Sequence, residues 1–250
     1  MKNLKQKLAD KELMVGTFVK TPSMMVAEVL SQTELDLVCI DAEHSPFDRR
    51  DLDACIFAYR AGEMDNVVRI ANDSDSEILN ALDCGATGIV VPHVDSADKA
   101  RRVAKASKYG AGGRGYAGST RAAGYASKSV LENLEYNRNE TVVIAQIEDL
   151  DAFNELDDIA ATDGIDCLFI GTMDLTVALG KTSAADPLVE QHAIKVCEVA
   201  KRHNKAVGIF VPSVDDVEKW QARGVSLFLM GSDHGFIKQG ANALCAKIKV

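Results

Sequence analysis

Short runs of apolar and β-branched residues recur along the whole chain, with more polar stretches between them. The apolar residues inside each run are continuous and do not alternate with polar ones. Such continuity is typical of strands that are buried on both faces of a parallel sheet. We predict eight strands, at residues 14–20, 35–43, 66–71, 88–94, 141–148, 166–172, 206–211 and 227–232.

Helix-forming patterns separate the predicted strands. They place apolar residues at helical spacing, and many open on Ser or Asp and close at Gly, as capped helices do. We predict helices within 23–32, 48–62, 74–85, 96–108, 150–161, 188–204 and 213–224. Eight strand–helix units in 250 residues match the usual size of a (β/α)8 barrel. The sequence therefore predicts an α/β fold, a (β/α)8 TIM barrel forming a single domain over residues 1–250. A doubly wound sheet is the alternative.

A segment rich in Gly and Ala, residues 109–129, interrupts this rhythm after the fourth predicted helix. It contains a formal G-x-G-x-x-G motif from Gly110 to Gly115. A dinucleotide-binding motif of this kind has to follow a strand and open a helix, whereas this one follows a helix. We therefore expect a mobile loop or lid near the barrel mouth and no nucleotide site.

The composition narrows the class of protein. Apolar residues make up 47% of the chain and charged residues 26%, as in an ordinary globular enzyme. The formal net charge of −9 disfavours binding to nucleic acid or to anionic membranes. The sequence shows no signal peptide and no run long enough to cross a bilayer. The six cysteines are scattered without a C-x-x-C motif, so we expect reduced thiols in the cytoplasm.

Polar and ionisable side chains stand at the ends of most predicted strands. In a barrel of this kind, chemistry takes place at the carboxyl ends of the strands, so these side chains would converge on one mouth. They are Lys20, Asp41, Glu43, His44, Arg69, His93, Gln146, Glu148, Asp174, Ser232, Asp233 and His234.

Glu148 and Asp174 follow two neighbouring strands, the fifth and the sixth. Two carboxylates at adjacent strand ends suit a hard cation such as Mg²⁺ or Mn²⁺, and they leave positions for water and a bidentate 2-oxo acid. The alternative is that either acid caps the helix that follows it.

Three further residues can each be interpreted as part of a catalytic site or as an ordinary structural or surface residue. Arg69 ends an apolar strand and has to meet an anion, which is a substrate oxygen or a barrel acid. His44 follows Asp41 by three residues, so Asp41 could bond one ring nitrogen and leave the other as a base; the alternative is a surface histidine in a loop. Lys20 could form a Schiff base with a keto substrate. It is otherwise a solvated loop lysine.

Several stretches together carry a resemblance to a known family, and they occur in family order over nearly the whole chain. The chain resembles the HpcH/HpaI class II aldolases, metal-dependent pyruvate aldolases that include 4-hydroxy-2-oxoheptanedioate and 2-keto-3-deoxy-sugar-acid aldolases. The matching stretches are "GTFVK", "IDAEHSPFD", "VVRIAND", "GATGIVVPHV", "GGRG", "AQIED" and "FIGTMDLT".

The resemblance implies a (β/α)8 barrel that assembles as a homo-oligomer, a trimer or a hexamer, with helix exchange between partners. It implies a divalent metal (Mg²⁺, Mn²⁺ or Co²⁺) held by Glu148 and Asp174. His44 is implied as the catalytic base, oriented by Asp41, and Arg69 as the group that stabilises the pyruvate enolate.

The resemblance also implies substrate contacts. Gln146 touches the pyruvyl group, and Asp83 reaches the site of a neighbouring subunit. The backbone at Gly171, Thr172 and Met173 holds the substrate carboxylate, and Val211 contacts the aldehyde half. The chain departs from the common family forms at 109–111, at 171–174 and at Val211 and Pro212, and we expect these changes to affect aldehyde preference.

The sequence thus predicts an aldolase that reversibly cleaves a 4-hydroxy-2-oxo acid into pyruvate and an aldehyde. His44, directly or through a water, would remove the C4 hydroxyl proton, and the metal and Arg69 would stabilise the enolate. One alternative is citrate-synthase-like or acyl-CoA lyase chemistry on the same scaffold. Another is a non-catalytic barrel that binds an oxo acid.

Overall fold

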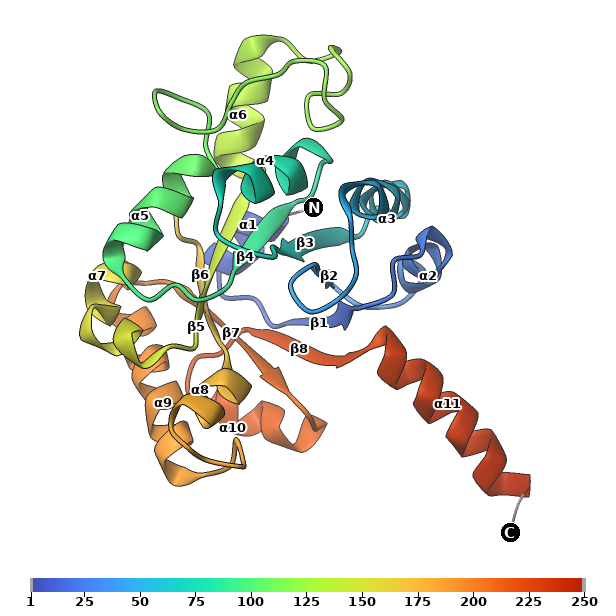
Figure 1. The fold of residues 1–250 in the computed structure, drawn as a ribbon, viewed down its shortest axis with the longest axis vertical. Coiled ribbons are helices and arrows are strands. Elements are labelled where there is room, and N and C mark those ends of the chain that lie inside the picture. Colours follow the sequence, from blue (N-terminus) through green and yellow to red (C-terminus); the bar gives the residue numbers. More distant parts are fainter. Residues whose placement is uncertain (1, 249–250) are drawn as a thin grey trace.

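Eight parallel strands close into a barrel in which each strand pairs with the next and the last pairs with the first. This computed structural model describes residues 2–248. The predicted (β/α)8 barrel is confirmed, and all eight predicted strands are present (Figure 1). They are β1 (Met14–Val19), β2 (Leu37–Asp41), β3 (Asp65–Arg69), β4 (Gly88–Val91), β5 (Val142–Ile147), β6 (Cys167–Ile170), β7 (Ala206–Val211) and β8 (Leu227–Ser232).

The predicted helices surround the barrel, and the residues that open them act as caps. Ser23, Ser74 and Ser96 each accept a backbone N–H from the first turn of their helix, and Asp48 forms a capping box. The elements are α2 (Met24–Leu30), α3 (Arg49–Ala61), α4 (Asp75–Asp83), α5 (Ala97–Ala106), the 3₁₀ turn η1 (Leu150–Asn154), α7 (Leu156–Ala161), α9 (Pro187–Arg202), the 3₁₀ turn η2 (Val214–Asp216) and α10 (Val217–Gln221).

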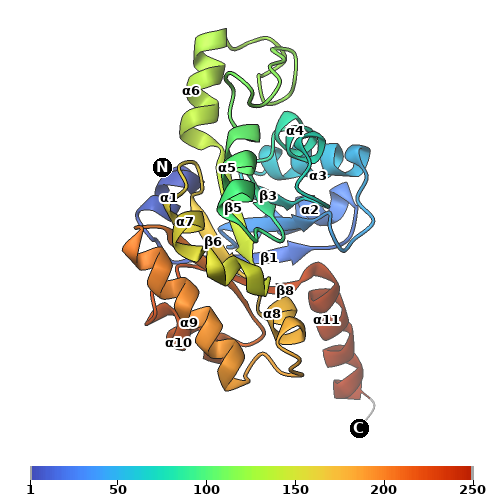
Figure 2. The ribbon, with the colours of Figure 1, turned by 60° about the vertical axis from the view of Figure 1, so that its left-hand side comes forward.

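Four helices were not predicted from the sequence. They are α1 (Leu4–Ala9), α6 (Val130–Glu140), α8 (Thr172–Ala178) and α11 (Asp233–Ile248). In α6 the buried side chains are asparagines, Asn133 and Asn137. Helix α11 projects from the barrel, and its residues beyond the first turn are exposed (Figures 1 and 2). The apolar side chains of α11 beyond its first turn thus stay exposed within residues 2–248.

Two apolar layers fill the barrel and its surroundings, which explains why the strands read as continuous apolar runs. Along β7, Val207, Ile209 and Val211 pack outward against the helices. Ala206 and Phe210 belong to the inner cluster. The same alternation runs along every strand because successive side chains point to opposite faces. Inward-facing positions near the strand ends therefore deliver their side chains to the barrel mouth.

The segment 109–129 joins α5 to α6 and lies beside the outer helices. Its Arg114 pairs with Asp83 at the end of α4, and its Arg121 pairs with Asp53 of α3 at 2.7 Å. A connection that leads from a helix into the next strand belongs to the amino ends of the strands, and Figure 2 shows the segment beside α6. Within one chain, the segment therefore does not take the lid position expected over the mouth.

Among residues 2–248, no helix combines the length and the apolar character that a membrane crossing requires.

Candidate active site

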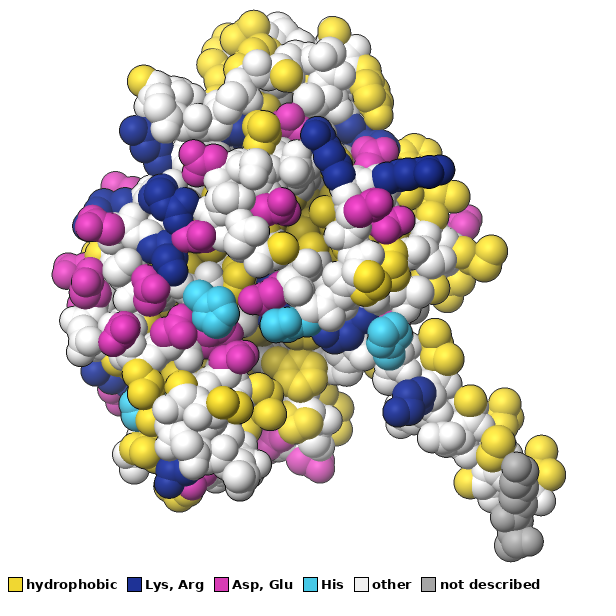
Figure 3. Space-filling view, in the orientation of Figure 1, with side chains coloured by type: hydrophobic (Ala, Val, Ile, Leu, Met, Phe, Trp, Pro, Cys, Tyr) yellow, Lys and Arg dark blue, Asp and Glu magenta, His cyan; other side chains and the backbone are white. Residues whose placement is uncertain are grey.

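The carboxyl ends of the strands surround a cavity of about 500 Å³. Histidine and acidic side chains gather at the centre of this face beside apolar surface (Figure 3). The cavity therefore combines ionisable groups with an apolar wall. Its described lining residues are Phe18, Lys20, His44, Arg69, Gln146, Phe169, Ile170, Gly171, Thr172, Met173, Asp174, Phe210, Gly231, Ser232 and Gly235.

Asp41 is fully buried at the end of β2 and lies at the centre of an ionic cluster. The register of the sheet sets Asp41 beside Arg69 of β3. The Arg69 Nη2 and Nε atoms lie 2.8 and 3.0 Å from Asp41 Oδ1, and Lys20 pairs with Oδ2. Burial alone would raise the pKa of Asp41, but Arg69 and Lys20 outweigh it and hold the pKa below its usual value. Asp41 is therefore a carboxylate that two cations share.

Glu43 extends this cluster toward the cavity. Its Oε2 atom lies 3.3 Å from Arg69 Nε, so the guanidinium faces two carboxylates at once. The sequence left open whether Arg69 meets a barrel acid or a substrate oxygen, and in the structure barrel acids lie beside it. The planar, multidentate guanidinium still borders the cavity, where it can also meet an oxygen of a substrate.

His44 lies in the loop after β2 and lines the cavity, with 56% of its side chain exposed. Its backbone N–H donates to Asp41 Oδ1 at 3.2 Å. The carboxylate beside its ring is Glu43, whose Oε2 lies 3.6 Å from Nε2. The sequence predicted that Asp41 would bond the ring. In the structure Asp41 instead fixes the loop backbone, because the chain turns at once after the strand and points this N–H back at it.

Glu148 follows β5 and is almost fully buried. Its Oε1 accepts the backbone N–H of His93 at 2.9 Å, and its Oε2 accepts a hydrogen bond from Gln146 Nε2. Burial is the largest influence on the pKa of Glu148 and, with the nearby Asp174 carboxylate, raises it above the usual value. Across residues 2–248, no Lys or Arg lies within ion-pair distance of either carboxylate. The buried charge of Glu148 thus lacks a strong counter-charge.

The surroundings of Glu148 and Asp174 fit a divalent cation. The Gln146 Oε1 atom is buried without a hydrogen-bond partner among the described residues. A Cβ atom on Gly171 would lie 2.5 Å from Glu148 Oε2, so the glycine leaves the space beside this carboxylate open. Carboxylate and amide oxygens are the hard ligands that Mg²⁺ and Mn²⁺ prefer, and an uncompensated buried carboxylate is costly without a cation.

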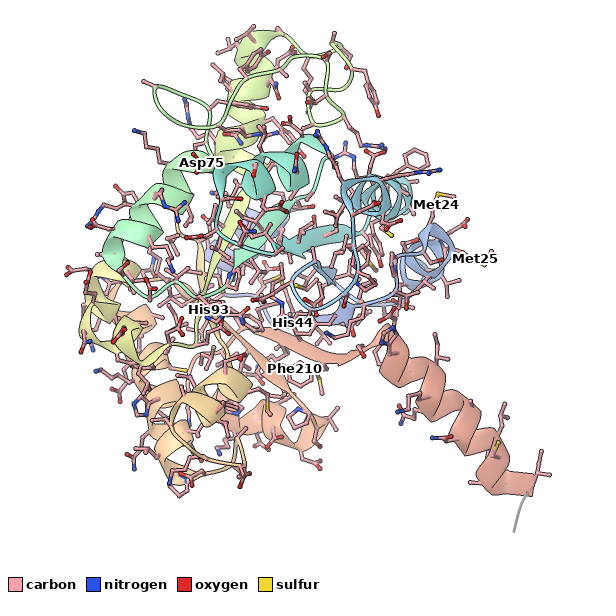
Figure 4. The ribbon with its side chains drawn as sticks, in the orientation of Figure 1. Met24, Met25, His44, Asp75, His93 and Phe210 are labelled. Atoms are coloured by element: carbon pink, nitrogen blue, oxygen red, sulfur yellow. The ribbon has the colours of Figure 1, made fainter. Side chains whose placement is uncertain are left out.

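His93 is a site residue to which the sequence reasoning gave no role. Its ring meets three acids: Nδ1 lies 3.0 Å from Asp149 Oδ2 and 3.4 Å from Glu148 Oε1, and Nε2 lies 3.7 Å from Glu43 Oε1. Burial lowers its pKa, but these carboxylates outweigh burial and raise the pKa. Figure 4 shows His93 near His44 at the mouth. In the sequence, the position of His93 at the end of the fourth predicted strand was the one sign that it belongs to the site.

The sequence and the fold of the chain match those of known proteins. A family model described as HpcH/HpaI aldolase/citrate lyase matches residues 14–239. The chain belongs to the HpcH/HpaI family. The match spans all eight strands, so the family covers the whole barrel and every residue of the cavity.

Relatives in the HpcH/HpaI family are named as aldolases. The hydroxypyruvate/pyruvate aldolase of Paraburkholderia phytofirmans PsJN is 30% identical over 92% of this chain and 91% of its own length. The 4-hydroxy-2-oxovalerate aldolase of Rhodococcus jostii RHA1 is 31% identical over 98% and 95%. The chain is accordingly a carbon–carbon lyase of the aldolase type.

Solved structures of HpcH/HpaI proteins superpose closely. A family protein from Burkholderia cenocepacia J2315 matches with a TM-score of 0.93 and 29% identity over 99% of both chains. The citrate synthase SbnG matches with a TM-score of 0.88 and 31% identity over 99% of this chain and 97% of its own. One scaffold thus includes proteins named for aldol chemistry and a protein named for citrate synthesis.

The remaining predicted site residues fall into two groups. Gly171 caps the amino end of α8, Thr172 and Met173 begin it, and all three line the cavity, while their contact with the substrate carboxylate stays a prediction. Val211 does not: it is 1% exposed and packs against the outer helices. The residue of β7 that lines the cavity is Phe210. The prediction erred by one position, and a shift of one residue moves a side chain to the other face of a strand.

Asp83 lies outside the cavity of its own chain. It ends α4, pairs with Arg114 and borders a separate hollow lined also by Arg49, Asp53 and Arg121. A role for Asp83 in catalysis therefore requires a neighbouring copy of the chain, and it stays a prediction.

Proposed function

We propose that the chain catalyses the reversible aldol cleavage of a 4-hydroxy-2-oxo acid into pyruvate and an aldehyde. The observation that carries the proposal is the cavity itself. Asp174 and the Arg69 guanidinium share its lining. Glu148 is buried beside the lining residues Gln146 and Gly171, and no Lys or Arg among residues 2–248 compensates the acid pair that it forms with Asp174. The acid pair can hold a cation, and the guanidinium provides a fixed positive charge. Both stabilise the negative charge that develops on an enolate oxygen.

Glu148 and Asp174 hold the cofactor, a divalent metal such as Mg²⁺, Mn²⁺ or Co²⁺, and the amide oxygen of Gln146 faces the same space. When bound, this metal supplies Lewis-acid polarisation of the 2-oxo group. The backbone of Thr172 and Met173, at the start of α8, borders the position proposed for the substrate carboxylate.

The chain's own residues handle the proton and the developing charge. His44 accepts the proton of the C4 hydroxyl group as the C3–C4 bond breaks and the aldehyde leaves. The electron pair of that bond forms the enolate, whose oxygen faces Arg69. A proton delivered to C3 then gives pyruvate. Asp41 acts as a positioning residue, because it fixes both the guanidinium and the backbone of His44.

The experiment that tests this function is a screen of pyruvate with a panel of aldehydes in the presence of Mn²⁺, Mg²⁺ or Co²⁺. Aldol products are identified by mass. A product of the mass expected for a 4-hydroxy-2-oxo acid with at least one aldehyde is the expected result. Exchange of the pyruvate C3 protons with solvent reports enolate formation without any aldehyde. Failure to exchange these protons with any of the three metals would count against the proposal.

A citrate-synthase-like reaction is the second candidate, and the close match to the citrate synthase SbnG favours it. That reaction would add the enolate of a CoA thioester to the ketone carbon of a 2-oxo diacid, and hydrolysis of the thioester by water would then release free CoA. Incubation with oxaloacetate and acetyl-CoA separates the two candidates. Release of free CoA with formation of a tricarboxylate would support the second, and unchanged acetyl-CoA would support the aldolase.

Replacement of His44 by Ala is expected to lower kcat for aldol cleavage by about 100-fold, toward the lower end of the range for general base catalysis. The half-exposed ring leaves room for water to replace part of its function. Binding of Mn²⁺ should be retained, because the acid pair does not depend on the imidazole. His93→Ala is the comparison variant. If His93→Ala loses turnover at normal metal content while His44→Ala keeps it, His93 is the base.

Homo-oligomerisation with helix exchange is the second part of this proposal. Helix α11 projects from its own barrel, as Figure 1 shows, and exposes Phe236, Ile237, Leu244 and Ile248. Its first residue is anchored, since Asp233 accepts the backbone N–H groups of Lys20 and Thr21 at 2.9 Å. Packing on a partner barrel would remove the apolar face of this projecting helix from water.

Truncation after Gly235 is expected to lower the oligomeric mass, because it removes this apolar face and keeps the Asp233 anchor. Light scattering coupled to gel filtration measures the mass. Lys238→Ala is the control on the same helix and should leave the mass unchanged. An unchanged mass after truncation would show that α11 does not join the subunits.

A further inference from the structure

An aromatic wall forms one side of the cavity. The Phe210 ring lies 5.9 Å from the Phe18 ring between centroids, with the planes tilted by 43°. The Phe18 ring in turn lies beneath Arg69, whose Cζ atom is 4.8 Å from the ring centroid. Figure 4 places Phe210 at the mouth next to His44. The wall thus begins at the guanidinium proposed to face the enolate and ends at Phe210.

The two cationic side chains that line the cavity already form ion pairs with acids of the barrel. Lys20 and Arg69 are the Lys and Arg side chains among its described lining residues. Lys20 pairs with Asp41, and Arg69 pairs with both Asp41 and Glu43. A carboxylate on an incoming aldehyde would therefore have to compete with Asp41 for Lys20, and with both Asp41 and Glu43 for Arg69. It would also lie in the field of Asp174 and Glu148.

We infer that the aldehyde half of the substrate is uncharged and apolar, and that Phe210 is the residue that sets this preference. This inference rests on the proposed aldol reaction. Gln146, Glu148 and Asp174 take the pyruvyl half on one side of the cavity, so the aldehyde substituent extends over Phe18 toward Phe210. Met173, at the start of α8 and 58% exposed, adds a flexible apolar surface to the same cavity.

The expected size of the preference follows from two effects that act in the same direction. An alkyl group gains free energy when it leaves water for an apolar wall, whereas a carboxylate loses hydration there without gaining a cation. Together these effects give an expected preference in kcat/KM of about 100-fold for the apolar aldehyde.

The decisive comparison uses two aldehydes of nearly the same shape with the wild-type enzyme, pyruvate and Mn²⁺. Succinic semialdehyde carries a carboxylate, and 4-methylpentanal carries an isopropyl group in its place. A kcat/KM ratio near 100 in favour of 4-methylpentanal is expected. Equal use of both aldehydes, or a preference for the semialdehyde, would overturn the inference. Pyruvate C3 exchange is measured in parallel, because its absence would count against the aldol reaction itself.

Substitutions on β7 then assign the preference to a residue. Phe210→Ala is expected to reduce the ratio by about tenfold, mainly through a higher KM for 4-methylpentanal. Phe210→Lys supplies a free cation and should shift the ratio toward succinic semialdehyde. Val211→Ala is the matched control, since the neighbouring side chain packs on the outer face of the same strand. A ratio that changes equally in Val211→Ala and Phe210→Ala would show that strand distortion, and not the ring, is responsible.

Discussion

Removal of divalent cations with a chelator is expected to abolish aldol turnover, and Mn²⁺ or Mg²⁺ should restore it. The reason is the uncompensated burial of Glu148 next to Asp174. A Lewis acid is worth several kcal/mol to a developing enolate, which corresponds to about 10³-fold in rate or more. The measurement is turnover against added metal, with bound Mn²⁺ followed by its electron paramagnetic resonance signal.

Two variants test whether Glu148 and Asp174 bind this metal. Glu148→Gln and Asp174→Asn keep the shape of each side chain and remove its charge, so both should weaken Mn²⁺ binding. Asp149→Asn is the matched control, because Asp149 is the next acid along the chain and contacts the His93 ring. Persistence of turnover after chelation, with a borohydride-trapped pyruvate adduct on Lys20, would identify a Schiff-base aldolase instead.

Arg69→Lys is expected to lower kcat/KM by about 10³-fold although the positive charge is kept. The guanidinium contacts Asp41 through two nitrogens and Glu43 through one, while its face rests on the Phe18 ring. An ammonium group is a point charge and cannot keep these contacts and also face an enolate oxygen. The loss should appear in pyruvate C3 exchange as well as in cleavage, since both pass through the enolate.

Arg102→Lys provides the control for the substitution type, because Arg102 is an exposed residue that pairs with Asp73, and neither lines the cavity. It should retain full activity. Denaturant unfolding of Arg69→Lys separates a folding defect from a catalytic one. Near-normal exchange in a folded Arg69→Lys protein would remove Arg69 from the mechanism.

The barrel could be predicted from the sequence because its strands are buried on both faces and read as unbroken apolar runs. The acids and bases at the strand ends were found for the same reason, since a charged residue that closes an apolar run stands out. Arg69 and His44 line the cavity, and Glu148 is buried next to the lining residue Gln146, while their roles stay predictions.

What could not be predicted depends on the direction of individual side chains. Val211 and Phe210 are neighbours of similar character, and only the register of β7 shows which of them faces the cavity. The partner of the His44 ring was also missed, because Asp41 and Glu43 are two residues apart and the turn after β2 decides between them. Helix α11 was not predicted either, and its residues after the first turn are exposed within residues 2–248.

The carboxylate of Asp41 ties together residues from three consecutive strand ends: Lys20 after β1, Asp41 itself on β2 and Arg69 on β3. Each of these residues is favourable only in the presence of the others, since the loss of one cation leaves the remaining pair unbalanced in a buried position. Their mutational effects are therefore expected to be strongly epistatic. During divergence within the family, changes at these positions should therefore have been accepted together or in an order that compensates each one.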